Sequence, residues 1–276
     1  METIDLKAHY SFLEGGSLYP LYVHEAFDKP NPLWKRPAVI VVPGGGYGMV
    51  CPREGEVVAA RFLAQGFQTF VFTYLTAKEN ASYPEARNEL GAAIDFVKKN
   101  ADRFHINKEE VFAVGFSAGG HLVADVAMEV NLLRQQYSLD ARLKGVGLGY
   151  PVISYEDGEM GSYRNLLSRY SEEEKASLRE KLSLEKHVTK DNPPTYIFAT
   201  GNDEVVPVSN AMRYANALFK AGVFCELHIF PQGAHGYSTG DKEVCTSPSY
   251  IDPTGRVRYW TDECSSFFRS LVKEPF

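Results

Sequence analysis

Ser117 lies in a segment whose residue types and spacing suit nucleophilic attack on an acyl group. Gly115-Phe-Ser-Ala-Gly119 fits the pattern G-x-S-x-G, and it stands between a strand-like run at 111–114 and an amphipathic run at 118–130. A serine on such a sharp strand-to-helix turn projects its hydroxyl above the sheet, and the flanking glycines remove the Cβ atoms that would clash there. The start of the following helix turns N–H groups towards developing negative charge. The segment therefore predicts the nucleophile of an acyl-transfer enzyme.

A triple glycine follows the apolar run at 38–42 and is the second feature with chemical meaning. In Pro43-Gly-Gly-Gly-Tyr47 the missing Cβ atoms let the backbone approach a ligand and turn its N–H groups towards it. A phosphate-binding loop would need a Lys-Ser/Thr pair or the spacing G-x-G-x-x-G at the start of a helix, and neither is present. We expect the N–H groups of Ala118 and of Gly45 or Gly46 to form an oxyanion hole.

An acid and a histidine each follow a further apolar run. Asp203 comes after the run at 194–200, and His235 lies on a glycine-rich loop after the run at 225–230. The order Ser117, Asp203, His235 is the order of an α/β-hydrolase triad, and the carboxyl ends of parallel strands meet at one edge of a sheet. Glu204 adjoins Asp203 and is the alternative acid. The other acids considered follow no strong strand: Asp191, Asp241 and Asp252.

The elements that must position these residues follow from the pattern of apolar residues. Strands are predicted at about 3–10, 18–24, 38–43, 68–75, 111–116, 145–150, 194–200 and 225–230. Helices are predicted at about 54–66, 84–100, 118–130, 208–222 and 260–272. The first two strands are close enough to form an antiparallel ribbon, and the later alternation of strands and helices requires a parallel sheet. The predicted fold class is therefore α/β, with a mostly parallel eight-stranded sheet and helices on both faces.

The connection between the strands at 145–150 and 194–200 is longer than a usual βα connection. Ser171 and Glu174 have the spacing of a capping box, which predicts the start of a helix. We expect a small cap insertion at about 154–190, over the carboxyl edge of a single domain that covers residues 1–276. The dense charge of this insertion counts against the broad apolar lid of a lipase.

Composition and charge limit the classes of partner. The chain has 276 residues and a net charge of −6, which disfavours nucleic acid and anionic membranes as partners. The N-terminal residues show no basic stretch followed by an apolar run, so we expect no signal peptide, and no apolar stretch has the length of a membrane span. Scattered cysteines without C-x-x-C spacing indicate reduced thiols in a cytoplasmic protein: Cys51, Cys225, Cys245 and Cys264.

Taken together, these motifs resemble those of the α/β-hydrolase-fold esterases of the acetyl xylan esterase and carbohydrate esterase-like group. The glycine loop resembles the H-G-G-G loop of such enzymes, with Pro43 in place of the histidine. Cys51 departs from the small polar residue that the group tends to carry at this position. The match runs from about residue 38 to residue 237 through Pro43-Gly-Gly-Gly-Tyr47, Arg53-Glu-Gly-Glu56, Gly115-Phe-Ser-Ala-Gly-Gly-His121, Tyr150-Pro-Val-Ile153, Asn202-Asp-Glu-Val-Val-Pro207 and Gly233-Ala-His-Gly236.

The resemblance implies a serine carboxylesterase that hydrolyses short-chain acyl esters, above all acetyl esters of carbohydrates or other small alcohols. Tyr47, Arg53 and Glu54 are the residues expected to contact such a substrate. The reaction requires neither a metal nor an organic cofactor, and an exposed edge strand would allow a homodimer. The alternatives are a small serine peptidase of the oligopeptidase type and a non-catalytic binding protein with a hydrolase fold. A binding protein would usually lose one member of the triad, whereas this chain retains all three.

Overall fold

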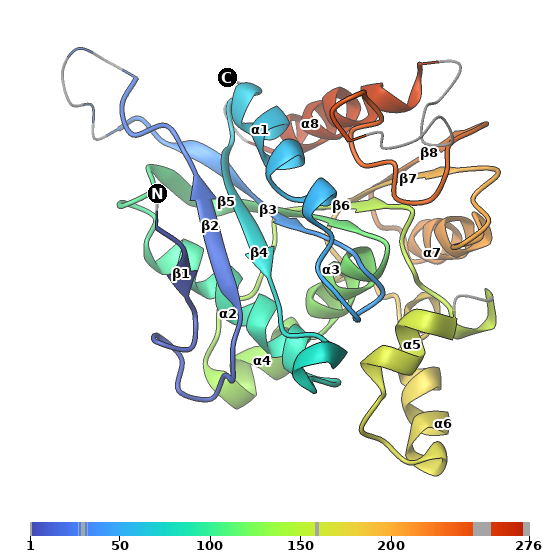
Figure 1. Cartoon of the computed structure of the whole chain (residues 1–276). Helices are drawn as coiled ribbons and strands as arrows, with labels where there is room; N and C mark the ends of the chain where they lie inside the picture. The colour runs from blue at the N-terminus through green and yellow to red at the C-terminus, as the bar shows by residue number, and fades with distance from the viewer. Residues whose placement is uncertain are drawn as a thin grey trace.

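The computed structural model describes residues 2–26, 28, 31, 33–157, 160–244 and 255–272. Within these residues the chain forms one eight-stranded sheet, which Figure 1 shows crossing the molecule between two layers of helices. The strand order is β1-β2-β4-β3-β5-β6-β7-β8. The strands are β1 (Ile4–Asp5), β2 (Ser17–Leu21), β3 (Arg36–Val42), β4 (Gln68–Thr73), β5 (Ile106–Phe116), β6 (Val146–Gly149), β7 (Thr195–Thr200) and β8 (Cys225–Phe230).

The sheet is antiparallel at one edge and parallel elsewhere, as the sequence predicts. β1 pairs antiparallel with β2 and β2 antiparallel with β4, whereas all pairings from β4 to β8 are parallel. The carboxyl ends of β3, β5, β6, β7 and β8 therefore lie along one edge. Two strands differ most from their predicted bounds. β1 has only two residues instead of the range 3–10, and β5 begins at Ile106, because Arg36 of β3 continues the pairing there.

Helices cover both faces of the sheet, and the sequence of β3 shows why. Val39 and Val41 pack into one buried cluster, and Ile40 and Val42 pack into the other, so both faces of this strand are apolar. α1 (Glu56–Ala64) and α8 (Trp260–Ser270) cover one face; α2 (Glu85–Lys99), α3 (Ala118–Met128) and α7 (Ser209–Lys220) cover the other (Figure 1).

One helix was not predicted. The amphipathic run after Ser117 is predicted to end at about residue 130, but α4 (Val130–Tyr137) follows α3 directly. Glu129 separates the two helices, because its φ of −97° and ψ of 19° lie outside the helical range. No helix among the described residues is both long and apolar enough to span a membrane.

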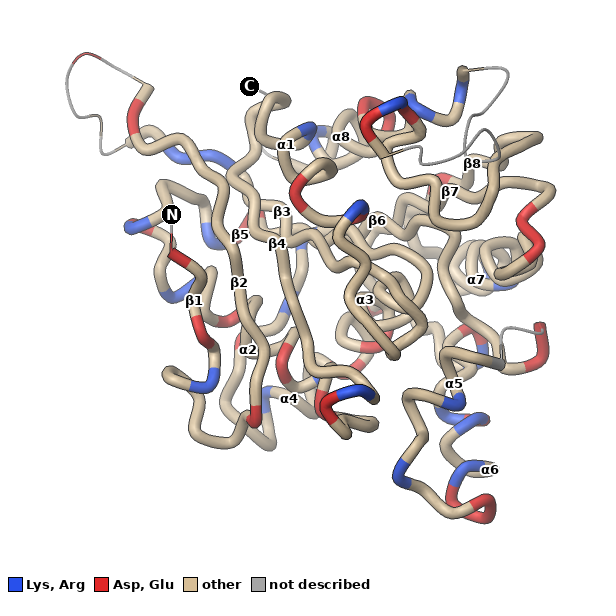
Figure 2. The backbone as a smooth tube through the Cα atoms, in the orientation of Figure 1, with Lys and Arg blue, Asp and Glu red and all other residues tan. Residues whose placement is uncertain are grey.

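The insertion between β6 and β7 contains α5 (Met160–Leu166) and α6 (Glu172–Lys181). The predicted capping box is confirmed, because the Ser171 hydroxyl accepts from the Glu174 N–H and the Glu174 carboxylate accepts from the Ser171 N–H. Figure 2 shows that acidic and basic residues follow one another along α6, which projects from the lower part of the molecule.

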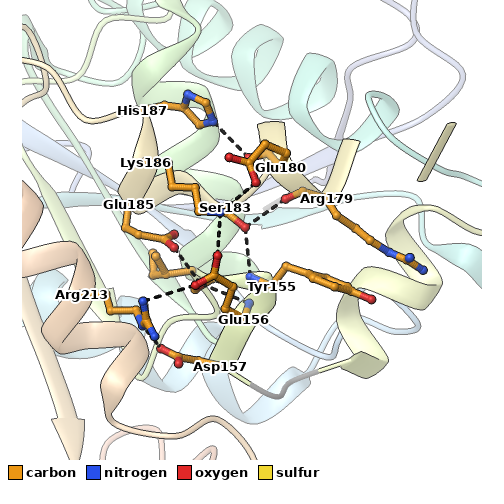
Figure 3. A network of polar contacts seen from close by, with 12 residues as sticks. Tyr155, Glu156, Asp157, Arg179, Glu180, Ser183, Glu185, Lys186, His187 and Arg213 are labelled. Carbon is orange, nitrogen blue, oxygen red and sulfur yellow. Dashed lines mark hydrogen bonds and ion pairs between the residues drawn. The ribbon is translucent and has the colours of Figure 1, made fainter. Parts of the chain in front are cut away.

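Ion pairs fix this insertion to α7, as Figure 3 shows. Lys186 Nζ lies 2.7 Å from a carboxylate oxygen of Glu156 and 2.8 Å from one of Glu180. Arg213 of α7 contacts Asp157, with 2.6 Å between Nε and Oδ2. Arg213 thus holds the start of the insertion to α7, and Lys186 joins Glu156 to Glu180 within the insertion.

Candidate active site

Ser117 occupies the sharp turn between β5 and α3 that the motif predicts. Its φ of 53° and ψ of −120° are unfavourable for a residue with a Cβ atom. The flanking glycines make the turn possible. A Cβ at Gly115 would lie 2.3 Å from the Gly119 carbonyl oxygen, and a Cβ at Gly119 would lie 2.2 Å from the Val42 carbonyl oxygen. Ser117 is only 7% exposed, so its hydroxyl lies in a restricted site at the edge of the sheet.

His235 and Asp203 form a hydrogen-bonded chain with Ser117. His235 Nε2 lies 2.9 Å from Ser117 Oγ, and His235 Nδ1 lies 2.7 Å from Asp203 Oδ2. The other carboxylate oxygen, Oδ1, accepts from the N–H groups of Val205 and Val206, each at 2.9 Å. Asp203 is buried, and these two backbone bonds fix the orientation of its carboxylate. The structure thus brings together the three residues that the sequence predicts as a triad.

The glycine loop lies beside this chain. Gly45 and Gly46 have φ angles of 123° and 62°, which favour glycine. The N–H groups of Gly45 and Ala118 have no acceptor within the described part of the chain. The Gly46 carbonyl accepts from Asn165 Nδ2 of α5 at 2.9 Å, so the insertion contacts the loop directly.

Glu54 does not lie where a substrate-contacting residue is expected. Its side chain is 2% exposed, and both oxygens are engaged: Oε2 accepts from the Gly44 N–H at 2.7 Å, and Oε1 accepts from the Tyr150 hydroxyl at 2.8 Å. Burial raises the pKa of this carboxyl group, and the hydrogen bonds from Tyr150 and Gly44 oppose that rise. Arg53 is partly exposed beside the histidine loop, with Nη2 at 2.7 Å from the position of a Cβ on Gly236. Its contact with substrate stays a prediction.

Tyr47 is also buried, so its side chain faces the protein interior instead of the solvent. Its hydroxyl lies 2.8 Å from His121 Nδ1, and His121 Nε2 lies 3.0 Å from the Leu182 carbonyl oxygen in the insertion. Since Nε2 must donate to that carbonyl, Nδ1 accepts from Tyr47. Burial lowers the pKa of His121 to about 4, which keeps this ring neutral. Both partners of His121 are distant in the sequence, so this ring joins the glycine loop to the insertion.

Tyr150 is the site residue that sequence reasoning did not single out. It directly follows β6, its φ is 35°, and its ring contacts the His235 ring edge-to-face with centroids 5.1 Å apart. Its position after a buried strand, like the positions of Ser117 and Asp203, could have indicated that it lies at the site.

Comparison with known proteins identifies the family of this chain. The sequence profile of the BD-FAE family matches residues 27–218, which is more than half of the chain. The chain belongs to the BD-FAE family. This BD-FAE protein is 34% identical over 238 residues to endo-1,4-beta-xylanase B of Butyrivibrio fibrisolvens, a match that covers 82% of the chain and 37% of the xylanase. It is 31% identical over 211 residues to an acetylxylan esterase of Xylanibacter ruminicola, a match that covers 74% of the chain and 41% of the esterase.

A solved structure extends the likeness of the BD-FAE chain over nearly its whole length. The acetyl ester-xyloside bifunctional hydrolase of Caldicellulosiruptor lactoaceticus superposes with a TM-score of 0.82 and 27% identity, over 98% of this chain and 96% of that one. The predicted fold and the resemblance to α/β-hydrolase esterases are therefore confirmed. The chain spans about two fifths of the length of the two curated relatives.

Proposed function

We propose that this chain is a serine carboxylesterase that hydrolyses short-chain acyl esters, with acetyl esters of carbohydrates as its substrates. One observation carries the proposal: the unbroken hydrogen-bonded chain from Ser117 Oγ through His235 to Asp203, with the serine on a strained turn at the carboxyl edge of the sheet. The names of the relatives, which include an acetylxylan esterase and an acetyl ester-xyloside hydrolase, support acetylated xylose sugars as the substrate class.

In the proposed reaction Ser117 Oγ attacks the acyl carbon while His235 Nε2 takes the serine proton. Asp203 holds the His235 Nδ1–H, which fixes the tautomer and stabilises the imidazolium. The N–H groups of Ala118 and Gly45 donate to the oxyanion, and one such donor contributes about 3 kcal/mol to transition-state stabilisation. His235 then returns the proton to the leaving alcohol. Water attacks the acyl-enzyme by the same route in reverse, and the acid is released. We predict that this reaction needs neither a metal nor an organic cofactor.

The test compares the wild type with Ser117→Ala on two substrate panels. The first panel contains acetylated xylo-oligosaccharides and p-nitrophenyl acetate, and the second contains aminoacyl-nitroanilides. We expect hydrolysis of the first panel by the wild type, labelling of Ser117 by a fluorophosphonate probe, and loss of more than about a thousandfold in kcat for Ser117→Ala. Peptide bond cleavage without ester preference would support the oligopeptidase alternative. Absence of both labelling and turnover would support a binding protein.

A further inference from the structure

Glu54 connects the two loops that flank the nucleophile. Its carboxylate accepts hydrogen bonds from the Gly44 N–H in the glycine loop after β3 and from the Tyr150 hydroxyl directly after β6. The next link reaches the histidine loop, because the Ser238 N–H donates to the Tyr150 hydroxyl oxygen at 3.1 Å. A second bond joins the same segments, since the Ser238 hydroxyl donates to the Arg53 carbonyl at 2.5 Å.

The direction of these hydrogen bonds suits the ionised form of Glu54. The Ser238 N–H can only donate, so the Tyr150 hydroxyl oxygen accepts from it, and the Tyr150 hydroxyl donates to Glu54 Oε1. The Gly44 N–H can only donate as well. Each oxygen of Glu54 therefore accepts one hydrogen, which suits a carboxylate.

Gly44 shows how close this carboxylate lies to the nucleophile. A Cβ on Gly44 would meet Ser117 Cβ at 2.9 Å and Glu54 Oε2 at 3.0 Å. The glycine backbone is thus enclosed between the two side chains. A displacement of Glu54 would release the loop that carries the Gly45 N–H, at a point next to Ser117.

The charged and titratable groups around Glu54 come from several elements. Arg53 and His235 bear positive charge when protonated, and each lowers the pKa of Glu54. Cys51 and Tyr74 face it as neutral groups, because burial raises the pKa of both. Around His235 stand Asp203 on Nδ1, Ser117 on Nε2, and the Tyr150 ring against its face. Glu54 therefore lies beside the histidine loop, because a Cβ on Gly236 would be 3.6 Å from Glu54 Oε1.

We propose that Glu54 is a positioning residue: its carboxylate fixes the glycine loop and the histidine loop relative to Ser117. This inference rests on the proposed esterase function. It differs from a structural role in one respect, because loss of the carboxylate must lower kcat while KM stays nearly unchanged.

The test uses the full chain with p-nitrophenyl acetate and compares Glu54→Gln with Glu56→Gln. Glu56 is exposed in the first turn of α1, two residues away, and is the matched control. We expect Glu54→Gln to lower kcat by at least about tenfold with KM within about twofold, because the oxyanion loop acts in the transition state. Glu56→Gln should leave both unchanged.

Tyr150→Phe keeps the inference testable if Glu54→Gln fails to fold. It removes the hydroxyl that joins Glu54 to the Ser238 N–H but keeps the carboxylate, so kcat should fall while KM stays within about twofold. An unchanged kcat in Tyr150→Phe, or an unchanged kcat in folded Glu54→Gln, overturns the positioning role. The proposed function fails separately: in that case the wild type itself neither hydrolyses the ester nor reacts with the fluorophosphonate probe at Ser117.

Discussion

Replacement of Asp203 by asparagine should reverse the tautomer of His235 while leaving the fold intact. The two carboxylate oxygens have different partners: Oδ1 accepts from two backbone N–H groups and Oδ2 accepts from His235 Nδ1. An asparagine must keep its oxygen on the backbone side, since its NH₂ group there would face two donors. The NH₂ group then donates to Nδ1, and the histidine proton moves to Nε2. Nε2 lies 2.9 Å from Ser117 Oγ and could no longer take its proton.

The expected loss of activity is large, and the expected loss of stability is small. A carboxylate-to-amide change that traps the wrong tautomer lowers kcat about 10⁴-fold in serine hydrolases. That factor corresponds to roughly 5.5 kcal/mol of transition-state stabilisation. The folded state keeps the side-chain volume and both backbone bonds, and it loses one charge-assisted hydrogen bond, worth about 2 kcal/mol.

The assay is kcat for p-nitrophenyl acetate together with thermal unfolding of Asp203→Asn and Glu204→Gln. Glu204 is the neighbouring acid and is exposed, so its replacement should change kcat by less than about twofold. Activity of Asp203→Asn within about tenfold of the wild type would refute the reasoning. So would a larger loss in Glu204→Gln, which would make Glu204 the acid.

Three further predictions concern the pocket and the scaffold. Acetyl and propionyl p-nitrophenyl esters should show a higher kcat/KM than octanoyl esters, because each methylene that stays unburied loses roughly 0.8 kcal/mol of binding free energy. A steady rise of kcat/KM with chain length would contradict a small acyl pocket. Burial raises the pKa of Glu89 to about 7 from 4.5, so the folded state binds more protons and loses stability as pH rises through that window. Urea unfolding should show Glu89→Gln gaining up to about 3 kcal/mol relative to the wild type between pH 5 and pH 8, and a constant difference would contradict the shift. Gly119→Ala should lower the free energy of unfolding by more than about 2 kcal/mol, because the new Cβ would lie 2.2 Å from a backbone atom. Gly222→Ala has open space around it and should lower the free energy of unfolding by about 1 kcal/mol. Equal losses in the two variants would refute the steric argument.

The parts of this protein that sequence reasoning predicted are those where a local pattern has one physical solution. The run 38–42 is apolar at every position, so it fits only a strand that is covered on both faces, and β3 is such a strand. Gly115, Ser117 and Gly119 have the spacing that a strand-to-helix turn needs. The order of Ser117, Asp203 and His235 along parallel strands was enough to predict that the three would lie together.

The parts that sequence reasoning missed depend on contacts between distant segments. From its place in a first helical turn, Glu54 could be either a partner of the helix dipole or a residue at the mouth of a pocket. Its burial depends on Tyr150, which lies 96 residues further along the chain. Tyr47 likewise depends on His121, 74 residues away. A local pattern cannot show which way such side chains turn, since a polar side chain next to a site can face the substrate or the scaffold.

Three strained residues stand at the carboxyl ends of neighbouring strands, and their side chains explain how the strain is held. Tyr47, Ser117 and Tyr150 follow β3, β5 and β6, with φ angles of 55°, 53° and 35°. Such backbone persists only where the surroundings over-determine it. The hydroxyl of Tyr47 is bound by His121, and that of Tyr150 by Glu54, so each tyrosine is fixed at its far end. Glycine would relieve the backbone at either position, but it would also release the loop. The buried hydrogen bonds of the two tyrosines thus hold the turns on both sides of Ser117, whose own hydroxyl is left to His235.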